Sequence, residues 1–312
     1  MFRTVRAHVP AWSLVAAAAC WGIATVISKR AVEEIEPLTL LPLELAVSVT
    51  ALAAVTAASR QRIRSSTELR RLGVLGLLNP GLSYALGLAG LALISASMSV
   101  LLWAAEPLLI LLFAWLLLRQ RVTGRVLAWS LVALVGVLLV VFVPGAGVEP
   151  VGVALTVAGV AACAIYTVLS SCLLVEASSL SVVLVQQVAA LLFSLVLFAG
   201  ALGVGEIGSL SAVSATGWAS AVVAGVLYYA VAFWFYLTGL RRIAPAVAGV
   251  FLNLIPIFGL ASSRLFLNEQ LTARQWVGAA VIVTAVVTIT RAQAQTLDRE
   301  PVATPTPGAE TA

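Results

Sequence analysis

Charged side chains are scarce in this chain, and histidine is almost absent. Only 10% of the 312 residues are charged and 62% are hydrophobic, whereas soluble domains carry about 25% charged residues. This excludes an ordinary soluble enzyme, and it excludes a disordered chain, because disorder needs low hydrophobicity and high net charge. The single histidine, His8, precedes the first apolar block. We therefore expect no metal site and no cofactor.

Cysteine and nucleotide-binding patterns are lacking too. The three cysteines (Cys20, Cys163 and Cys172) lie inside apolar blocks without C-x-x-C or Cys/His spacing, which predicts buried side chains instead of a disulfide framework or a metal site. No G-x-x-x-x-G-K-[ST] loop is present, so we expect no ATPase in this chain. Its basic residues indicate anchoring at a membrane surface, with no nucleic-acid partner.

Long apolar blocks fill most of the sequence. Each has about the length that a helix needs to cross a bilayer, and their residues are apolar on every face, unlike the alternating strands of a β-barrel. The sequence predicts an all-α polytopic membrane protein with ten transmembrane helices, an N-terminal tail at 1–11 and a disordered C-terminal tail at 291–312. The predicted spans are 12–31, 38–58, 72–91, 96–118, 125–143, 152–174, 181–202, 214–240, 245–267 and 273–290.

The basic residues predict the orientation. If the N-terminus is inside, fourteen of the 18 Lys and Arg residues fall on the inner side, and only Lys29, Arg30, Arg264 and Arg274 fall outside. Lys and Arg accumulate in cytoplasmic loops. We therefore expect both termini in the cytoplasm and the protein in the cell (plasma or inner) membrane.

The chain repeats itself. A shift of 149 aligns Gly76 with Gly225 and Pro107 with Pro256, and a shift of 143 aligns Glu44 with Gln187 near the front of each half. Each half, 12–143 and 152–290, holds five spans, so the halves must lie in the membrane with opposite orientation. Inverted repeats around a central site are a recurrent plan of secondary transporters.

Several short motifs resemble the drug/metabolite transporter superfamily, and within it the EamA-type ten-helix exporters. They are Trp21-Gly22, Lys29, Glu106-Pro107, Pro256 and the Asn268–Thr272 turn. The resemblance covers about 12–290. It implies two EamA repeats around a central cavity and alternating access for small metabolites such as amino acids, nucleobases or drugs.

Two acids inside spans are the main candidates for a substrate or proton site. Glu106 lies near mid-membrane, where a carboxylate costs at least about 2.5–3.5 kcal/mol, and no Lys or Arg occupies the middle of any span. It is either a proton-coupling or substrate-amine site, or a protonated side chain hydrogen-bonded to a neighbouring helix. Glu44 is either a functional acid or a side chain that reaches the outer surface or pairs with Lys29 or Arg30.

Further polar residues within the spans are expected to line a cavity, and the aromatic residues within the spans either line it or, more often, pack within the bundle or face lipid. Asn79 and Asn253 could instead bond a neighbouring backbone, and Trp103, at i−3 from Glu106, is expected on the same helix face. Trp21, Thr25 and Ser28 share one face of the first span, which we interpret as helix packing, and Pro107 and Pro256 are expected to kink their helices beside the site. The other lining candidates are Gln186, Gln187, Tyr166, Tyr228, Tyr229, Trp234 and Tyr236.

The preferred hypothesis is a secondary transporter that exports small metabolites across the plasma membrane and is not an enzyme. Its partners would be a small-molecule substrate and the lipid bilayer, with proton coupling open and the protein either a monomer or a homodimer. A membrane-embedded enzyme is the alternative, although the spans contain no His or Asp. A non-transporting sensor or chaperone subunit is another.

Overall fold

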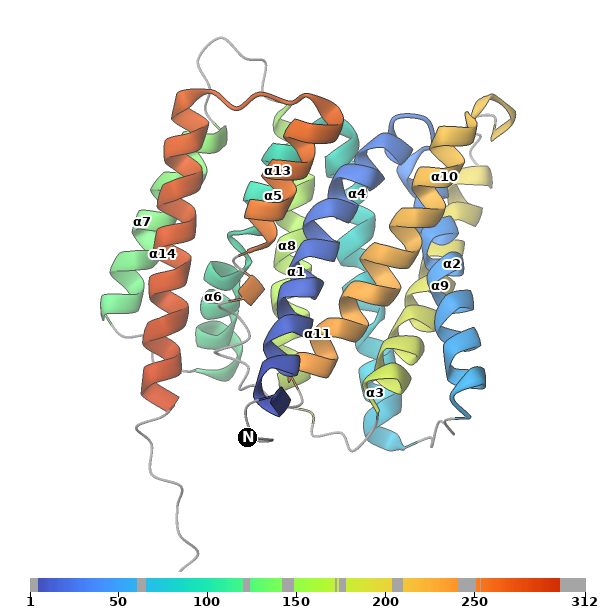
Figure 1. Ribbon diagram of the computed structural model, residues 1–312, viewed down its shortest axis with the longest axis horizontal. Coiled ribbons are helices and arrows are strands. Elements are labelled where there is room, and N and C mark those ends of the chain that lie inside the picture. Colours follow the sequence, from blue (N-terminus) through green and yellow to red (C-terminus); the bar gives the residue numbers. More distant parts are fainter. Residues whose placement is uncertain are drawn as a thin grey trace, which may run out of the picture.

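Figure 1 shows the computed structural model, a bundle of helices that run roughly side by side. The structure describes residues 5–60, 66–119, 124–141, 149–171, 173, 178–203, 210–240, 251–252 and 254–297, and every regular element within them is a helix. Seven helices are long and apolar enough to cross a membrane, and three shorter apolar helices accompany them. The protein is a polytopic all-α membrane protein, as the sequence predicted.

In the first half, each predicted span corresponds to one helix or to a chain of helices. The third span is bent by a wide π-helical segment, η1, and the fourth consists of two separate helices. The elements are α1 (Val5–Val32), α2 (Pro37–Ala58), α3 (Thr67–Leu75), η1 (Leu77–Leu82), α4 (Ser83–Leu93), α5 (Ala96–Trp103), α6 (Glu106–Leu118) and α7 (Gly124–Val141).

The second half repeats this order within its described part. A π-helical segment, η3, again lies inside the third span, and a proline again stands in the first turn of the last helix of the fourth span. The elements are α8 (Pro150–Ser171), α9 (Ser179–Gly203), the short η2 (Leu210–Ala212), α10 (Ala215–Ala224), η3 (Gly225–Val231), α11 (Ala232–Leu240), α13 (Ile255–Leu267) and α14 (Ala273–Leu297).

The two halves are inverted relative to each other. Helices α1 and α8 open the two halves and run in opposite directions, and α1 begins on the face of the bundle where α14 ends (Figure 1). We call this the N-terminal face. The opposite face, where α1 ends and α2 begins, is called the Glu34 face.

Equivalent helix ends confirm the 149-residue repeat. Arg119, after α6, and Asn268, after α13, both have a left-handed backbone conformation, with φ of 54° and 53°. Their N–H groups donate to the carbonyls of Ala114 and Ser263 respectively, which are also 149 residues apart. A left-handed residue in this place closes the last turn of a helix.

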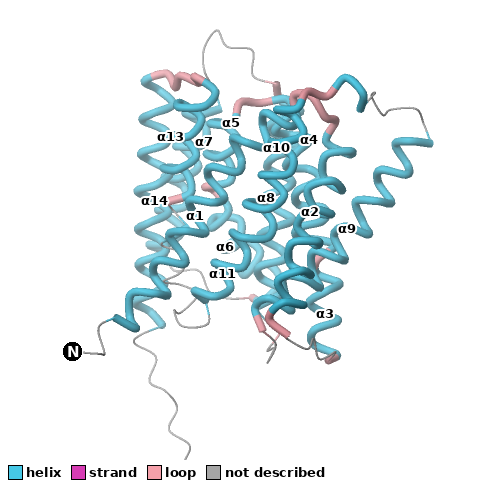
Figure 2. Tube along the Cα trace, turned by 45° about the vertical axis from the view of Figure 1, so that its right-hand side comes forward, coloured by secondary structure: helices cyan, strands magenta, loops and turns pink. Residues whose placement is uncertain are grey.

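Contacts between helices follow the same symmetry. Helix α2 packs against α9, α1 packs against α11 and α13, and α8 packs against α4 and α6. Helices α7 and α14 pack mainly on each other and lie together on one side of the bundle (Figure 2). The inverted halves therefore meet through α1, α2, α8 and α9 at the centre.

The helix limits bear on two expectations. The fourth span, Ala96–Leu118, is interrupted beside its proline in the manner of the expected kink: α5 ends at Trp103 and α6 begins at Glu106, while Ala104 and Ala105 between them keep right-handed helical backbone angles. Proline lacks an N–H and its ring clashes with the carbonyl four residues earlier, which for Pro107 is that of Trp103. Helix α14 also continues to Leu297 and α1 begins at Val5, so helix covers part of both predicted tails. An apolar run sets the length of a membrane span, whereas backbone hydrogen bonding can continue the helix beyond it.

Candidate functional site

Interrupted helices position the candidate site. Segments η1 and η3 lie at equivalent places in the two halves, and within η1 the backbone of Asn79 is extended, with φ of −144° and ψ of 119°. Pro107 and Pro256 stand in the first turns of α6 and α13. Interrupted helices near the bilayer midplane form the substrate sites of many secondary transporters.

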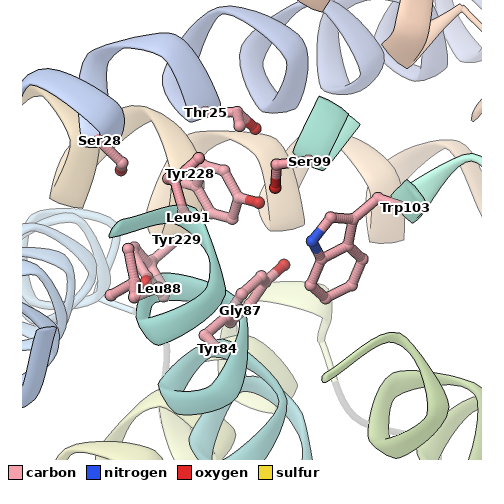
Figure 3. Close-up of a pocket in the computed structure, with 10 residues that line it drawn as sticks. All are labelled: Thr25, Ser28, Tyr84, Gly87, Leu88, Leu91, Ser99, Trp103, Tyr228 and Tyr229. Carbon is pink, nitrogen blue, oxygen red and sulfur yellow. The ribbon is translucent and has the colours of Figure 1, made fainter. Parts of the chain in front are cut away.

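A small cavity lies beside these interruptions. Tyr84 stacks on Trp103 with ring centroids 5.7 Å apart, and Tyr228 and Tyr229 each meet Tyr84 edge-on at 5.1 Å. Figure 3 shows the polar ends of Tyr84, Tyr228 and Trp103 turned toward the same space. The cavity measures about 20 Å³, room for one or two water molecules. Its lining consists of Thr25, Ser28, Tyr84, Gly87, Leu88, Leu91, Ser99, Trp103, Tyr228 and Tyr229.

Glu44 is completely buried next to this cavity. Its exposed fraction is 0%, and its Oε1 accepts a 2.9 Å hydrogen bond from the Ser28 hydroxyl. The Tyr229 side chain lies beside the carboxylate, but Oε2 has no full hydrogen bond from any described residue. Glu44 is therefore a buried acid with one oxygen left to bind something else.

The two basic side chains that could have paired with Glu44 are engaged elsewhere. The Lys29 ammonium donates to the carbonyl of Leu91 at 3.0 Å, at the end of α4, and lies 3.9 Å from Glu33. The Arg30 guanidinium donates to the carbonyl of Phe266 at 2.9 Å. Glu44 thus neither reaches the surface nor pairs with either residue.

Glu106 is the first residue of α6 and faces α8. The Cys163 thiol donates to its Oε1 at 3.3 Å, and Thr167 on the next turn of α8 also contacts the carboxylate. Trp103 and Glu106 are separated by the two residues between α5 and α6, and both interact with Tyr84. The start of a helix carries partial positive charge, so this position favours a carboxylate at an otherwise apolar depth.

The glutamines of α9 occupy the equivalent place in the second half. Gln187 donates to the carbonyl of Tyr229 at 3.1 Å, its Oε1 has no partner among the described residues, and Gln186 donates to the Tyr166 hydroxyl at 2.8 Å. A Cβ on Gly225 would meet the carbonyl oxygen of Glu44 at 2.7 Å, and one on Gly76 would meet that of Gln186 at 2.5 Å. By packing, the counterpart of Glu44 is Gln186, one residue from the aligned Gln187.

Of the remaining candidates, one is buried, one lies on the surface of the bundle and one lies outside the described residues. Asn79 is 3% exposed and its Oδ1 has no partner among the described residues. Trp234 is 43% exposed, on the outside of the bundle. Asn253 and Cys172 lie outside the described residues. No three His, Cys, Asp or Glu side chains of the described chain gather in the manner of a metal site.

Comparison with known proteins decides the family. The model of the EamA-like transporter family matches residues 10–142 and again 150–291, nearly all of the chain. The chain belongs to the EamA-like transporter family. An uncharacterized transporter of Archaeoglobus fulgidus is 24% identical over 279 residues, which span 87% of this chain and 95% of that protein. A crystal structure with 18% identity shares the fold, with a TM-score of 0.60 over 92% of this chain and 98% of the other.

Hydrogen bonds join the two halves of this EamA-like transporter at the Glu34 face. The Glu34 carboxylate accepts hydrogen bonds from the backbone N–H and the hydroxyl of Ser214 at 2.7 and 2.8 Å. These bonds hold the pKa of the Glu34 carboxyl below its usual range. The contact is therefore present at neutral pH and weakens only as the pH falls through that lowered pKa.

A second acid, Glu269 of the predicted family turn, makes an equivalent contact on the same face. Its two carboxylate oxygens accept from the N–H groups of Ala96 and Ser97 at 2.8 Å each, so a residue of the second half caps α5 of the first. The hydroxyls of Ser97 and Ser263 add a 2.7 Å bond between the halves. Glu34 and Glu269 together join the two halves of the EamA-like transporter at this face.

Sequence reasoning missed part of the lining. Tyr84 and Ser99 were not among the candidates, and Thr25 and Ser28, interpreted as packing residues, line the cavity. Trp21 does pack, with its ring edge-on to Phe233 at 5.2 Å and to Tyr236 at 5.4 Å. Tyr84 could have been found, because it and Glu106 are the only ionisable residues between Leu72 and Leu118.

Proposed function

We propose that this transporter is a secondary exporter that moves small metabolites by alternating access between its two inverted halves. The observation that carries this proposal is the aromatic-lined cavity between the halves, placed where their helices are interrupted. The cavity admits only water-sized groups, so a substrate enters only after the halves have moved apart on one face. The contacts of Glu34 and Glu269 must then break when the Glu34 face opens.

The basic residues support an orientation with the N-terminal face in the cytoplasm. By the ends of the helices that carry them, Lys29, Arg30, Arg264 and Arg274 lie at the Glu34 face. The described basic residues at the N-terminal face include Arg60, Arg70, Arg71, Arg119, Arg125 and Arg291. Lys and Arg favour the cytoplasmic side, so the closed Glu34 face is the outer one. A reporter fused after Leu297 that was found outside the cell would contradict this orientation.

Glu106 is the residue we assign to proton coupling. It is partly exposed, its carboxylate bonds a thiol instead of a cation, and it begins a helix whose dipole helps to hold a negative charge. A carboxyl group in this setting can lose and regain a proton as access alternates. Glu44, completely buried away from any described Lys or Arg, is assigned to the neutral acid form in this closed conformation, because an unpaired buried charge costs several kcal/mol.

Flux through purified protein in liposomes tests the proposal. Vesicles with an acidic interior and an internal pH dye are mixed with radiolabelled amino acids, nucleobases or amines. We expect at least one compound to accumulate unchanged, with a matching rise of internal pH beyond that in protein-free vesicles. A compound altered by the protein would indicate an enzyme. If every compound moved no faster than through protein-free vesicles, the transport proposal would fail.

A further inference from the structure

The first observation is an aromatic lining on several sides of the cavity. Tyr84 comes from α4, Trp103 from α5, and Tyr228 and Tyr229 from η3, so the rings approach one space from separate helices (Figure 3). The hydroxyls of Thr25, Ser28 and Ser99 fill the gaps between them. The faces of aromatic rings carry negative charge density and attract cations, most strongly in a site without water.

The second observation is a pair of acidic side chains that flank this lining. Glu44 bonds the lining residue Ser28 and lies beside Tyr229. Glu106 interacts electrostatically with Tyr84 and Tyr228. Both acids come from the first half, since the packing counterpart of Glu44 is Gln186 and the aligned counterpart of Glu106 is Ile255. The acidic side chains are thus concentrated on one side of the chamber.

The third observation concerns positive charge. Among the described residues, Lys and Arg lie near helix ends, and Lys29 and Arg30, the closest along the chain to Ser28, are bound to backbone carbonyls. Lys29 is the described cation nearest the cavity, since its ammonium bonds the carbonyl of the lining residue Leu91 at 3.0 Å. It is already held by that carbonyl, by the carbonyl of Ala92 and by Glu33, so the carboxylate of a substrate could pair with it only by displacing these contacts. A buried charge without a partner is strongly disfavoured.

We propose that the chamber selects a small organic cation, an amine or ammonium group on an aromatic or aliphatic body. The cationic group lies between Glu106 and Glu44, and the body packs on Trp103 and Tyr84. Zwitterions and anions are rejected because Lys29, the described cation nearest the cavity, is already bound to backbone carbonyls and leaves their carboxylate without a partner. This inference rests on the proposed transport function and names the substrate class of the same site.

Four compounds with one 4-hydroxyphenyl body test this selection: tyramine (cation), tyrosol (neutral), tyrosine (zwitterion) and 4-hydroxyphenylacetate (anion). Binding of radiolabelled tyramine to the purified protein, and its displacement by the other three, gives their relative affinities. We expect tyramine to bind at least tenfold more tightly than tyrosol, with the zwitterion and the anion weaker still. Equal binding of tyramine and tyrosol, tightest binding of tyrosine or of the anion, or no saturable tyramine binding would overturn the proposal.

Variants separate the parts of the site. Glu106→Gln with Glu44→Gln is expected to reduce the preference for tyramine over tyrosol to less than threefold, whereas Glu36→Gln, at an exposed carboxylate without a side-chain capping bond, keeps it. Trp103→Leu is expected to weaken tyramine at least fivefold, and Trp103→Phe to weaken it less. If the double glutamine variant folds and keeps its preference for tyramine over tyrosol, the assignment of the two acids is wrong. If that variant does not fold, the relative affinities of the four compounds for the unmodified protein decide the proposal.

Flux measured with the same four compounds distinguishes this inference from the proposed function. Saturable tyramine binding without flux of any compound would contradict transport and leave the cation preference standing. Flux of tyrosine or of the anion, with tyramine neither bound nor carried, would overturn the cation preference and leave transport standing.

Discussion

Replacing Glu106 with glutamine is expected to abolish transport driven by a pH gradient while the protein stays folded. The glutamine oxygen can still accept the Cys163 thiol, so the contact between α6 and α8 is kept. The side chain can no longer lose or gain a proton, however, and the exchange of a proton at this position stops. The measurement compares substrate accumulation in vesicles with and without an imposed pH gradient.

The matched control for this variant is Glu36→Gln. Glu36 is exposed before α2, and its side chain makes no capping hydrogen bond there. We expect this variant to keep the pH dependence of the unmodified protein. If Glu106→Gln showed the same pH-driven accumulation as Glu36→Gln, the proton assignment would be wrong.

Replacing Gly225 or Gly76 with alanine is expected to cause the second large effect, a loss of both stability and transport. The added Cβ would lie 2.7 Å from the carbonyl oxygen of Glu44 in one case and 2.5 Å from that of Gln186 in the other. These neighbours are backbone atoms, which cannot move aside as a side chain end can. Overpacking of this kind costs about 1–3 kcal/mol and would push η3 away from α2, or η1 away from α9.

Thermal unfolding in detergent and vesicle flux measure the two effects. Gly200→Ala is the matched control, because a Cβ on Gly200 would meet nothing within 4 Å, and alanine is the better helix former. We expect each of the two contact glycine variants to unfold at a temperature several degrees lower than the Gly200 variant and to lose most of its flux. Equal unfolding temperatures for all three would show that the contacts at η1 and η3 are not tight.

The architecture could be predicted from the sequence because it follows from repeated local signals. Apolar runs of span length and the 149-residue repeat were sufficient, and the left-handed helix ends at Arg119 and Asn268 confirm that register in detail. The family resemblance likewise rested on residues that now have visible contacts. Glu269 of the predicted turn, for instance, caps α5.

The details of the site were less predictable because they depend on packing between distant segments. The proline in the run Trp103-Ala-Ala-Glu106-Pro107 indicated a kink, but the sequence did not indicate that two residues would separate α5 from α6. Sequence alignment could not decide whether Gln186 or Gln187 is the counterpart of Glu44, because the two glutamines are adjacent and of the same type. Only the packing of α9 against the start of η1 distinguishes them. Tyr84 joins Trp103, Tyr228 and Tyr229 through tertiary contacts between three elements, which no local pattern specifies.

The central claim, that the inverted halves alternate around the chamber, is tested most directly by locking the Glu34 face. The native cysteines are first replaced, Cys20 and Cys172 by alanine and Cys163 by serine, and the flux of this background protein is measured. Glu34→Cys and Ser214→Cys are then introduced at a hydrogen-bonded pair that joins the halves. A short bifunctional thiol reagent with a reducible bridge then joins the two cysteines, and a pair within one half, Glu33→Cys with Glu36→Cys, serves as the control.

We predict that the bridge between the halves stops flux, that reduction of the bridge restores it, and that the bridge within one half changes it little. Undiminished flux in protein whose bridge between the halves is complete would contradict alternating access.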